Sequence, residues 1–143
     1  MGKLAPPLLE GTVPAFYSEN GIAKIAIPFS MNRAVSKAQV KGIAIKVKTA
    51  QGTSSIYSAN TLDEDLLCFY DLETAPWVEF YVPEDVIKFN VGQFYKVQLA
   101  YISSVDGSVG YYSTVGVTKC TAKPEISIKH MYDGKINSHI YEY

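Results

Sequence analysis

The stretch that decides the fold of this chain is FNVGQFYKVQL, residues 89–99. An apolar residue stands six positions before Tyr95 and a glycine three positions before it, and from Tyr95 onward apolar and polar residues alternate as in a strand. Gly92 permits a sharp crossover between two sheets, and the Tyr95 hydroxyl can form a hydrogen bond with backbone upstream of it. The pattern therefore predicts a tyrosine corner, which is a feature of β-sandwiches.

On either side of this stretch the chain carries further short segments in which apolar and polar residues alternate. Ile43, Ile45 and Val47, for example, share one side of a segment whose other side carries Lys46 and Lys48. Aromatic residues make up 13% of the chain and β-branched residues are frequent, and both favour strands. The seven predicted strands lie within residues 8–16, 24–29, 43–48, 54–58, 78–82, 95–101 and 109–120.

Turn residues separate these segments and predict how the strands pair. Asn20-Gly21 and Asp106-Gly107 are typical of tight hairpins, so we expect antiparallel neighbours at both places. Pro28 removes a backbone donor, so its strand must end, bulge or lie at a sheet edge there. The predicted fold class is all-β, an antiparallel seven-stranded β-sandwich. The residues predicted to fill its core are Ile25, Ile27, Ile43, Ile45, Val47, Phe80, Val82, Val97, Leu99 and Val115.

The composition fits one folded domain and excludes several other classes of protein. The chain has 143 residues, of which 48% are hydrophobic and 19% are charged, so it can bury one core. Its 13 basic and 14 acidic residues give a net charge of −1, so no global basic field attracts nucleic acid. No apolar run approaches the ~20 residues of a membrane span. We therefore expect no nucleic-acid partner and no membrane insertion.

Residues that carry chemistry are few and scattered. Cys68 and Cys120 lie 52 positions apart and form no C-x-x-C pair. A zinc site needs about four closely spaced ligands, and neither His130 nor His139 is close to a cysteine in the sequence. We therefore predict two unpaired, mostly buried thiols and exposed, non-catalytic histidines. The sequence predicts no catalytic, cofactor-binding or metal-binding residue and no cofactor.

Acidic residues concentrate in the middle of the chain. Residues 51–90 hold eight acidic residues and one lysine, a net charge of −7, whereas residues 1–50 hold seven basic and two acidic residues, a net charge of +5. This asymmetry can orient a subunit against copies of itself, or it can be an ordinary solvated surface. The triplet DED at 63–65 lacks the spacing of an EF-hand, and with Asp71 and Glu73 it does not define a glycosidase pair. We interpret these carboxylates as a solvated loop.

Outward-facing aromatic residues are the better candidates for a binding surface. Tyr81 and one of Tyr111 and Tyr112 are expected to face away from the core, and Trp77 stands at the start of a predicted strand. Exposed aromatic residues mark protein interfaces or platforms on which sugars stack. The alternative is that neighbouring loops partly bury them.

The stretch at 89–95 resembles a corner of fibronectin type III domains, where a Leu-x-Pro-Gly-x-x-Tyr pattern occupies the same place. Phe89 stands for the leucine, Gly92 and Tyr95 match, and Val91 departs from the pattern because it replaces the proline. The resemblance covers roughly residues 6–121. It implies a fibronectin type III-like β-sandwich of the wider immunoglobulin-like group.

Three shorter stretches are similar to N-terminal modules of large phage and prophage tail or fibre proteins. They are PAFY at 14–17, PFSMNRAVS at 28–36 and GYYS at 110–113. This similarity implies a non-enzymatic virion component of a tail, baseplate or fibre. Such a component is assembled in the bacterial cytoplasm and contacts other virion proteins or copies of itself. The alternative is a β-sandwich module that binds host surface glycan, on a virion or at a bacterial cell surface.

The chain is predicted to divide into a sandwich, residues 1–122, and a short C-terminal segment, residues 123–143. The proline-marked stretch at 122–128 echoes residues 5–10, and such a stretch commonly precedes a new module in tandem sandwiches. The C-terminal segment is too short for a second sandwich of ~100 residues. We expect it to be a linker and the start of a following module, or a tail that docks in an assembly.

Overall fold

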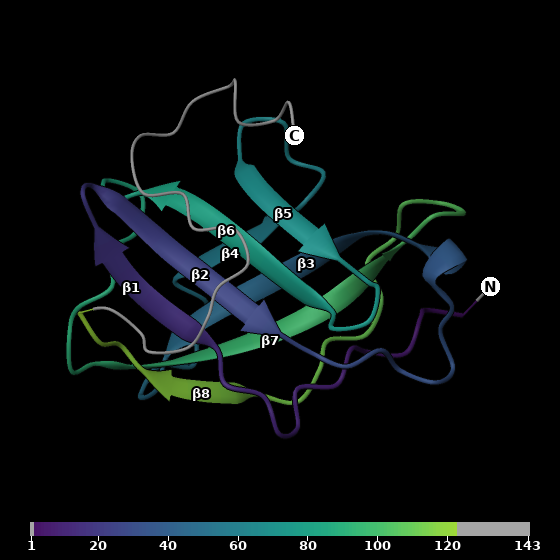
Figure 1. Cartoon of the computed structure of the whole chain (residues 1–143), viewed down its shortest axis with the longest axis horizontal. Helices are drawn as coiled ribbons and strands as arrows, with labels where there is room; N and C mark the ends of the chain where they lie inside the picture. The colour runs from purple at the N-terminus through teal and green to yellow at the C-terminus, as the bar shows by residue number, and fades with distance from the viewer. Residues whose placement is uncertain (1, 123–143) are drawn as a thin grey trace.

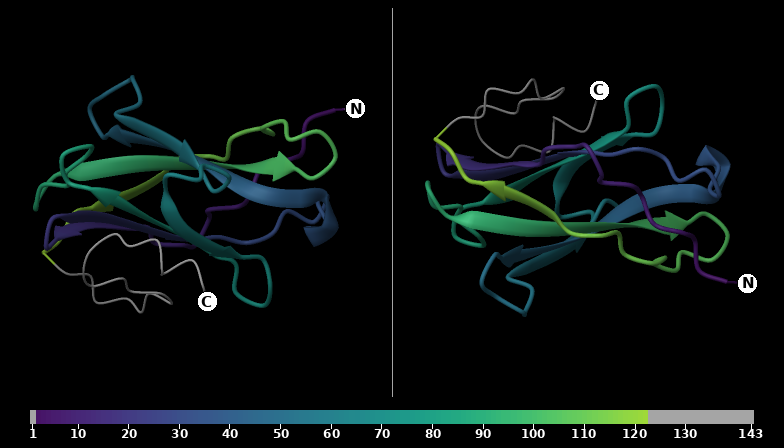
Figure 2. Two further views of the ribbon diagram at one scale, coloured as in Figure 1. Left: turned by 90° about the horizontal axis from the view of Figure 1, so that it is seen from above. Right: turned by 90° about the horizontal axis from the view of Figure 1, so that it is seen from below.

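The computed structural model of this chain describes residues 2–122, which form two four-stranded antiparallel sheets packed face to face (Figure 1, Figure 2). The strands of the first sheet, in spatial order, are β1 (Ala15–Glu19), β2 (Ile22–Pro28), β6 (Trp77–Pro83) and β5 (Leu67–Asp71). The strands of the second sheet, in spatial order, are β4 (Tyr57–Asn60), β3 (Val40–Thr49), β7 (Phe94–Ser103) and β8 (Gly116–Lys119). A short 3-10 turn, η1 (Lys37–Gln39), precedes β3.

The hairpin between β1 and β2 forms at the turn that the sequence predicts. Asn20 and Gly21 have φ angles of 54° and 81°, and a two-residue hairpin of this kind requires positive φ at both positions. The pairing runs from Glu19 opposite Ile22 along the whole of β1. β2 ends at Pro28, which confirms the interruption that the missing backbone donor predicts.

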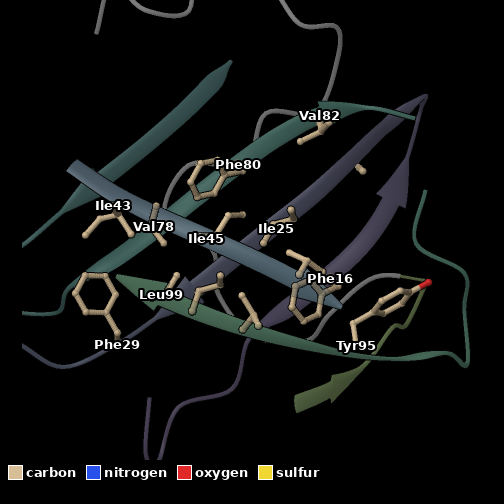
Figure 3. Close-up of a cluster of buried hydrophobic side chains, with 14 of the residues drawn as sticks. Phe16, Ile25, Phe29, Ile43, Ile45, Val78, Phe80, Val82, Tyr95 and Leu99 are labelled. Carbon is tan, nitrogen blue, oxygen red and sulfur yellow. The ribbon is translucent and has the colours of Figure 1, made fainter. Parts of the chain in front are cut away.

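Side chains from both sheets meet in one core between the layers (Figure 3). Nine of the ten residues predicted for the core are buried, namely Ile25, Ile27, Ile43, Ile45, Val47, Phe80, Val82, Val97 and Leu99. The prediction for Val115 is wrong, because this residue is 45% exposed. Alternation therefore identifies the buried side of the long strands and fails in the last one.

The error at Val115 comes from the phase of the last strand. β8 is four residues long, and Gly116 lies opposite the core residue Val97, so the core side of this strand begins one position later than predicted. A side chain at Gly116 would be crowded, because its Cβ would lie 3.3 Å from Leu9 Cδ1 and the Leu9 side chain would have to shift. The predicted strand at 109–120 is therefore too long, and the predicted inward orientation of Val115 is wrong.

The described residues form eight strands, whereas the sequence predicts seven. The missed strand is β5, whose sequence LCFYD is apolar or aromatic at four successive positions and shows no alternation. The strand predicted within 8–16 is also displaced. β1 begins at the end of that range, while Leu8 makes an isolated bridge with Ser30.

The crossover before β7 is a tyrosine corner, as predicted. The Tyr95 hydroxyl accepts a hydrogen bond from the backbone N–H of Asn90 at 2.9 Å, and the rings of Tyr95 and Phe89 pack in a T-shaped arrangement with 4.8 Å between their centroids. Gly92 has a φ of 89°, a conformation that L side chains rarely adopt. The corner carries the chain from the first sheet to the second.

Two further sequence predictions concern the C-terminal segment and membrane insertion. The C-terminal segment 123–143, with His130 and His139, lies outside the described residues. Among residues 2–122, no helix has the length and apolar character needed to cross a membrane.

Candidate functional site

The carboxylates that the sequence singled out lie in the loop before β5, at the last residue of β5 and just after it, and they support local turns. Asp63 Oδ1 accepts the backbone N–H of Asp65 at 3.1 Å, and Asp71 Oδ1 accepts that of Glu73 at 2.9 Å. Within residues 2–122, no three His, Cys, Asp or Glu side chains are grouped so that they could hold a metal ion. These carboxylates are placed by turn geometry and do not converge on a common point.

The two cysteines are free thiols in the structure. Burial, together with the nearby Asp63 carboxylate, raises the pKa of Cys68 to about 11. Burial also raises the pKa of Cys120. Because the thiolate is the reactive form, both side chains are poor nucleophiles near neutral pH.

A surface depression of about 510 Å³ lies between η1 and the loop that joins β5 to β6. Its lining residues are Met31, Val35, Ser36, Lys37, Leu72, Glu73 and Thr74. Lys37 Nζ and Glu73 Oε2 form an ion pair at 2.7 Å, and both side chains are more than half exposed. An exposed pair of this kind contributes little stability, and the depression contains no arrangement of groups that suggests a reaction.

The outer face of the first sheet carries polar and aromatic side chains that are nevertheless buried. Tyr17, Lys24 and Tyr81 lie opposite one another across three adjacent strands, and each is at most 2% exposed. Glu79, on the same face of β6, is also 2% exposed. We call these four residues the buried outer face.

The charged groups of the buried outer face have polar partners. Lys24 Nζ lies 3.4 Å from Glu19 Oε1 and 5.5 Å from the centre of the Tyr17 ring. The Tyr81 hydroxyl donates a hydrogen bond to Glu79 Oε1. Burial, with added repulsion from Glu19 and Glu79, raises the pKa of Tyr17 to about 12. These contacts offset part of the cost of burying charge.

The buried outer face decides between two interpretations of Tyr81, exposure and burial, in favour of burial, and it adds residues that the sequence did not single out. Tyr81 does point away from the main core, as predicted, but it packs in a separate cluster with Ile22 and Leu67 and is not exposed. Trp77 is also buried. The signal that could have revealed this face is the apolar and aromatic character of its outward positions, among them Tyr17.

The outer face of the second sheet has the opposite character. Lys46, Lys48, Lys96 and Lys119 occupy outward positions of β3, β7 and β8 and are partly or fully exposed. Lys48 lies directly opposite Lys96 across the sheet. The outward positions of these three strands and of β4 carry no aspartate or glutamate. We call these four lysines the lysine face.

Aromatic side chains on this side of the molecule lie beneath lysine ammonium groups. Lys46 Nζ is 4.0 Å from the centre of the Tyr112 ring, and the matching distance from Lys3 Nζ to Tyr111 is 5.3 Å. Tyr112 also packs on the cluster of small and aliphatic residues formed by Ala44, Ala100 and Ile102. Tyr111 is 57% exposed, so the prediction of an outward tyrosine in this pair is confirmed.

Comparison with known proteins gives similarity in structure alone. No protein-family model matches this chain, and no curated protein matches it. The chain is similar to part of Astrotactin-2, a conserved vertebrate-specific and perforin-like membrane protein involved in neuronal development. The TM-score is 0.44 with 8% identity, over 82% of this chain and 22% of that one. The chain is also similar to part of MtrC from Shewanella baltica OS185. The TM-score is 0.42 with 9% identity, over 85% of this chain and 23% of that one. This chain spans less than a quarter of either structure.

Proposed function

We propose that this chain is a non-enzymatic structural and interaction module that works as one part of a larger assembly. The observation that carries this proposal is the contrast between the two outer faces of the sandwich. The buried outer face is closed to solvent, whereas the lysine face presents several cations on one sheet with no carboxylate at an outward position. A broad, charged and otherwise regular surface favours recognition of a partner over catalysis.

We propose that the sandwich belongs to the fibronectin type III or wider immunoglobulin-like group, which suits this role. Two features support the assignment. The Tyr95 hydroxyl bonds to backbone five positions upstream, as in the tyrosine corner of such domains. The first sheet pairs its strands in the order β1-β2-β6-β5, which matches the four-stranded sheet of constant-type immunoglobulin domains. Such domains serve many functions, so the fold by itself does not choose one.

The assembly that we propose is a phage or prophage tail, baseplate or fibre. Support comes from the sequence stretches at 14–17, 28–36 and 110–113, which are similar to modules of such proteins. In the structure, the last of these stretches carries Tyr111 and Tyr112, which lie beside Lys3 and Lys46.

Immunogold labelling of purified particles tests this role. An antibody against the recombinant chain is applied to particles released from the strain that encodes it, with particles from a strain deleted for the gene as the control. We expect gold at the tail or baseplate of the first sample alone. Label on the bacterial surface and none on particles would contradict the virion role and favour a cell-surface module.

Glycan binding is the weaker alternative, because the aromatic rings beside the lysine face are not open platforms. Tyr112, Tyr111 and Phe94 each have a lysine ammonium within 6 Å of the ring centre, at 4.0, 5.3 and 5.9 Å. A sugar that stacked on these rings would first have to displace the cations. On a glycan array we expect no signal that Tyr111→Ala abolishes, and a signal lost in that variant would favour the alternative.

A further inference from the structure

We propose that the lysine face binds a second copy of this chain through its acidic edge. The acidic edge consists of Asp63, Glu64 and Asp65, which are exposed in the loop before β5. The inference rests on the interaction role proposed above and deepens it by naming the partner. It concerns a surface of the second sheet and a loop beside the first sheet, both within the described residues.

The lysine face carries an unfavourable charge arrangement that an anionic partner would relieve. Lys48 and Lys96 are directly opposite each other on neighbouring strands, and like charges in this position destabilise a sheet. Lys96 Nζ donates to the Gly52 carbonyl at 3.1 Å, which orders the side chain without neutralising it. A carboxylate placed between the two ammonium groups would turn repulsion into attraction.

The acidic edge has a matching excess of negative charge. The ion pairs found within residues 2–122 join Lys24 to Glu19 and Lys37 to Glu73, so they engage neither the lysine face nor the acidic edge. Asp63 uses one carboxylate oxygen to accept the backbone N–H of Asp65. The remaining carboxylate oxygens of the edge are directed to no cation of the described chain.

The positions of the two surfaces predict a head-to-tail contact. The lysine face lies on outward positions of β3, β7 and β8 in the second sheet, and the acidic edge lies in the loop before β5, the edge strand of the first sheet. Because these are different surfaces of one molecule, one copy donates the first and its neighbour the second, and the contact is heterologous. Such contacts build rings or open filaments, as a repeated component of an assembly requires.

A second copy suits this surface better than a nucleic acid. The chain has a net charge of −1, so a long polyanion would be attracted by the lysine face and repelled by the rest of the molecule. A second copy presents a compact group of carboxylates instead. Charge complementarity of this kind fixes orientation and adds modest affinity.

The test is sedimentation velocity of the full chain over protein concentrations up to about 1 mM, because small charged contacts bind weakly. At about 50 mM salt we expect the mean sedimentation coefficient to rise with concentration. At about 0.5 M salt, where charges are screened within a few ångström, we expect it to fall to the monomer value.

Two charge-reversal variants and their matched controls identify the surfaces. Lys46→Glu/Lys96→Glu removes the net charge of the lysine face and Glu64→Lys/Asp65→Lys reverses the charge of the acidic edge, and we expect each variant alone to be monomeric. An equimolar mixture should form one-to-one dimers, because the first variant keeps its acidic edge and the second keeps its lysine face. A contact between identical surfaces would not be restored by mixing.

The controls change the net charge equally at other exposed or half-buried sites. Arg33→Glu/Lys88→Glu and Glu84→Lys/Asp85→Lys should associate with themselves as the unchanged chain does. The proposal is overturned by a wild-type chain that stays monomeric, by a mixture without dimers, or by controls that lose association. Binding to a DNA duplex in place of self-association also overturns it. None of these outcomes affects the particle labelling that tests the proposed function.

Discussion

The two outer faces of this sandwich have the same origin in the sequence and opposite environments in the structure. Lys24 alternates with core residues of β2 and Lys46 alternates with core residues of β3, so the pattern treats them alike. Lys24 is 2% exposed and lies between two tyrosines. Lys46 is partly exposed beside Tyr112. Alternation thus predicts which side chains leave the core, but not whether they then meet water.

This difference changes the interactions that each face requires. A buried ammonium or carboxylate is costly unless it is paired and hydrogen-bonded, which accounts for the contacts of Lys24 with Glu19 and of Glu79 with Tyr81. An exposed lysine keeps its hydration and needs no partner within the chain. The buried outer face is therefore a matter of stability, and the lysine face is open to function.

The largest loss of stability is expected for substitutions in the core between the two faces. Leu99 is fully buried between the sheets (Figure 3), so Leu99→Ala should lower the free energy of unfolding by ~2–5 kcal/mol through lost burial and a cavity. Urea denaturation followed by tryptophan fluorescence measures this. A loss as small as that of an exposed residue would mean that β7 is turned the other way and that the two faces are wrongly assigned.

Much of the fold can be predicted from the sequence because local rules determine it. The hairpin at Asn20-Gly21, the end of β2 at Pro28 and the corner at Tyr95 each depend on a few adjacent residues. The missed strand β5 is different. As an edge strand it is recognised by its pairing with β6, a contact between distant parts of the chain, and its apolar run gives no periodic signal.

The candidate surfaces are harder to predict than the fold, for a physical reason. The sequence shows a positive first third and a negative middle, but which lysines share a surface depends on the register between strands. Lys48 and Lys96 are 48 positions apart and become neighbours only because β3 pairs with β7. The burial of Glu79 likewise depends on what surrounds its sheet, and composition does not reveal it.

The buried outer face should be sensitive to the loss of a single hydroxyl group. Tyr81→Phe removes the donor to Glu79 and leaves a buried carboxylate without that hydrogen bond, so we expect a loss of ~1.5–3 kcal/mol in the free energy of unfolding. The matched change on the other face, Lys46→Ala, should fall within ~0.5 kcal/mol of the unchanged chain. Equal effects at both positions would remove the distinction between the faces.

The same contrast predicts an effect of alkaline pH. The pKa of Tyr17 is raised from 10.0 to about 12 by burial and nearby carboxylates, so at intermediate pH the folded chain holds a proton that the unfolded chain has released. Stability that is complete below pH 10 is therefore lost as the pH rises towards 12.

The measurement is the midpoint of urea denaturation at several pH values between 10 and 12. Tyr17→Phe should lose less stability than the unchanged chain over this range. Tyr57, whose pKa is also raised to about 12, lies on β4 in the other sheet, and Tyr57→Phe should remove a separate share of the loss. If Tyr57→Phe alone flattens the pH dependence, the buried outer face is not its source.

The smallest effect is expected on the lysine face, and it has the opposite sign. Lys96→Glu places a carboxylate directly opposite Lys48, and exchanging a like-charge pair for an attractive one should raise the free energy of unfolding by ~0.2–1 kcal/mol. The hydrogen bond from Lys96 to the Gly52 carbonyl is lost, which limits the gain. Lys96→Gln removes the repulsion without adding attraction, so its gain should be smaller. Both gains should shrink at high salt, because exposed charges are screened there, and denaturation midpoints at two salt concentrations measure this.

A Lys96→Glu variant that folds more stably but no longer associates would show that the repulsion between Lys48 and Lys96 serves binding. A loss of stability that does not depend on salt would show that Lys96 has a structural role instead.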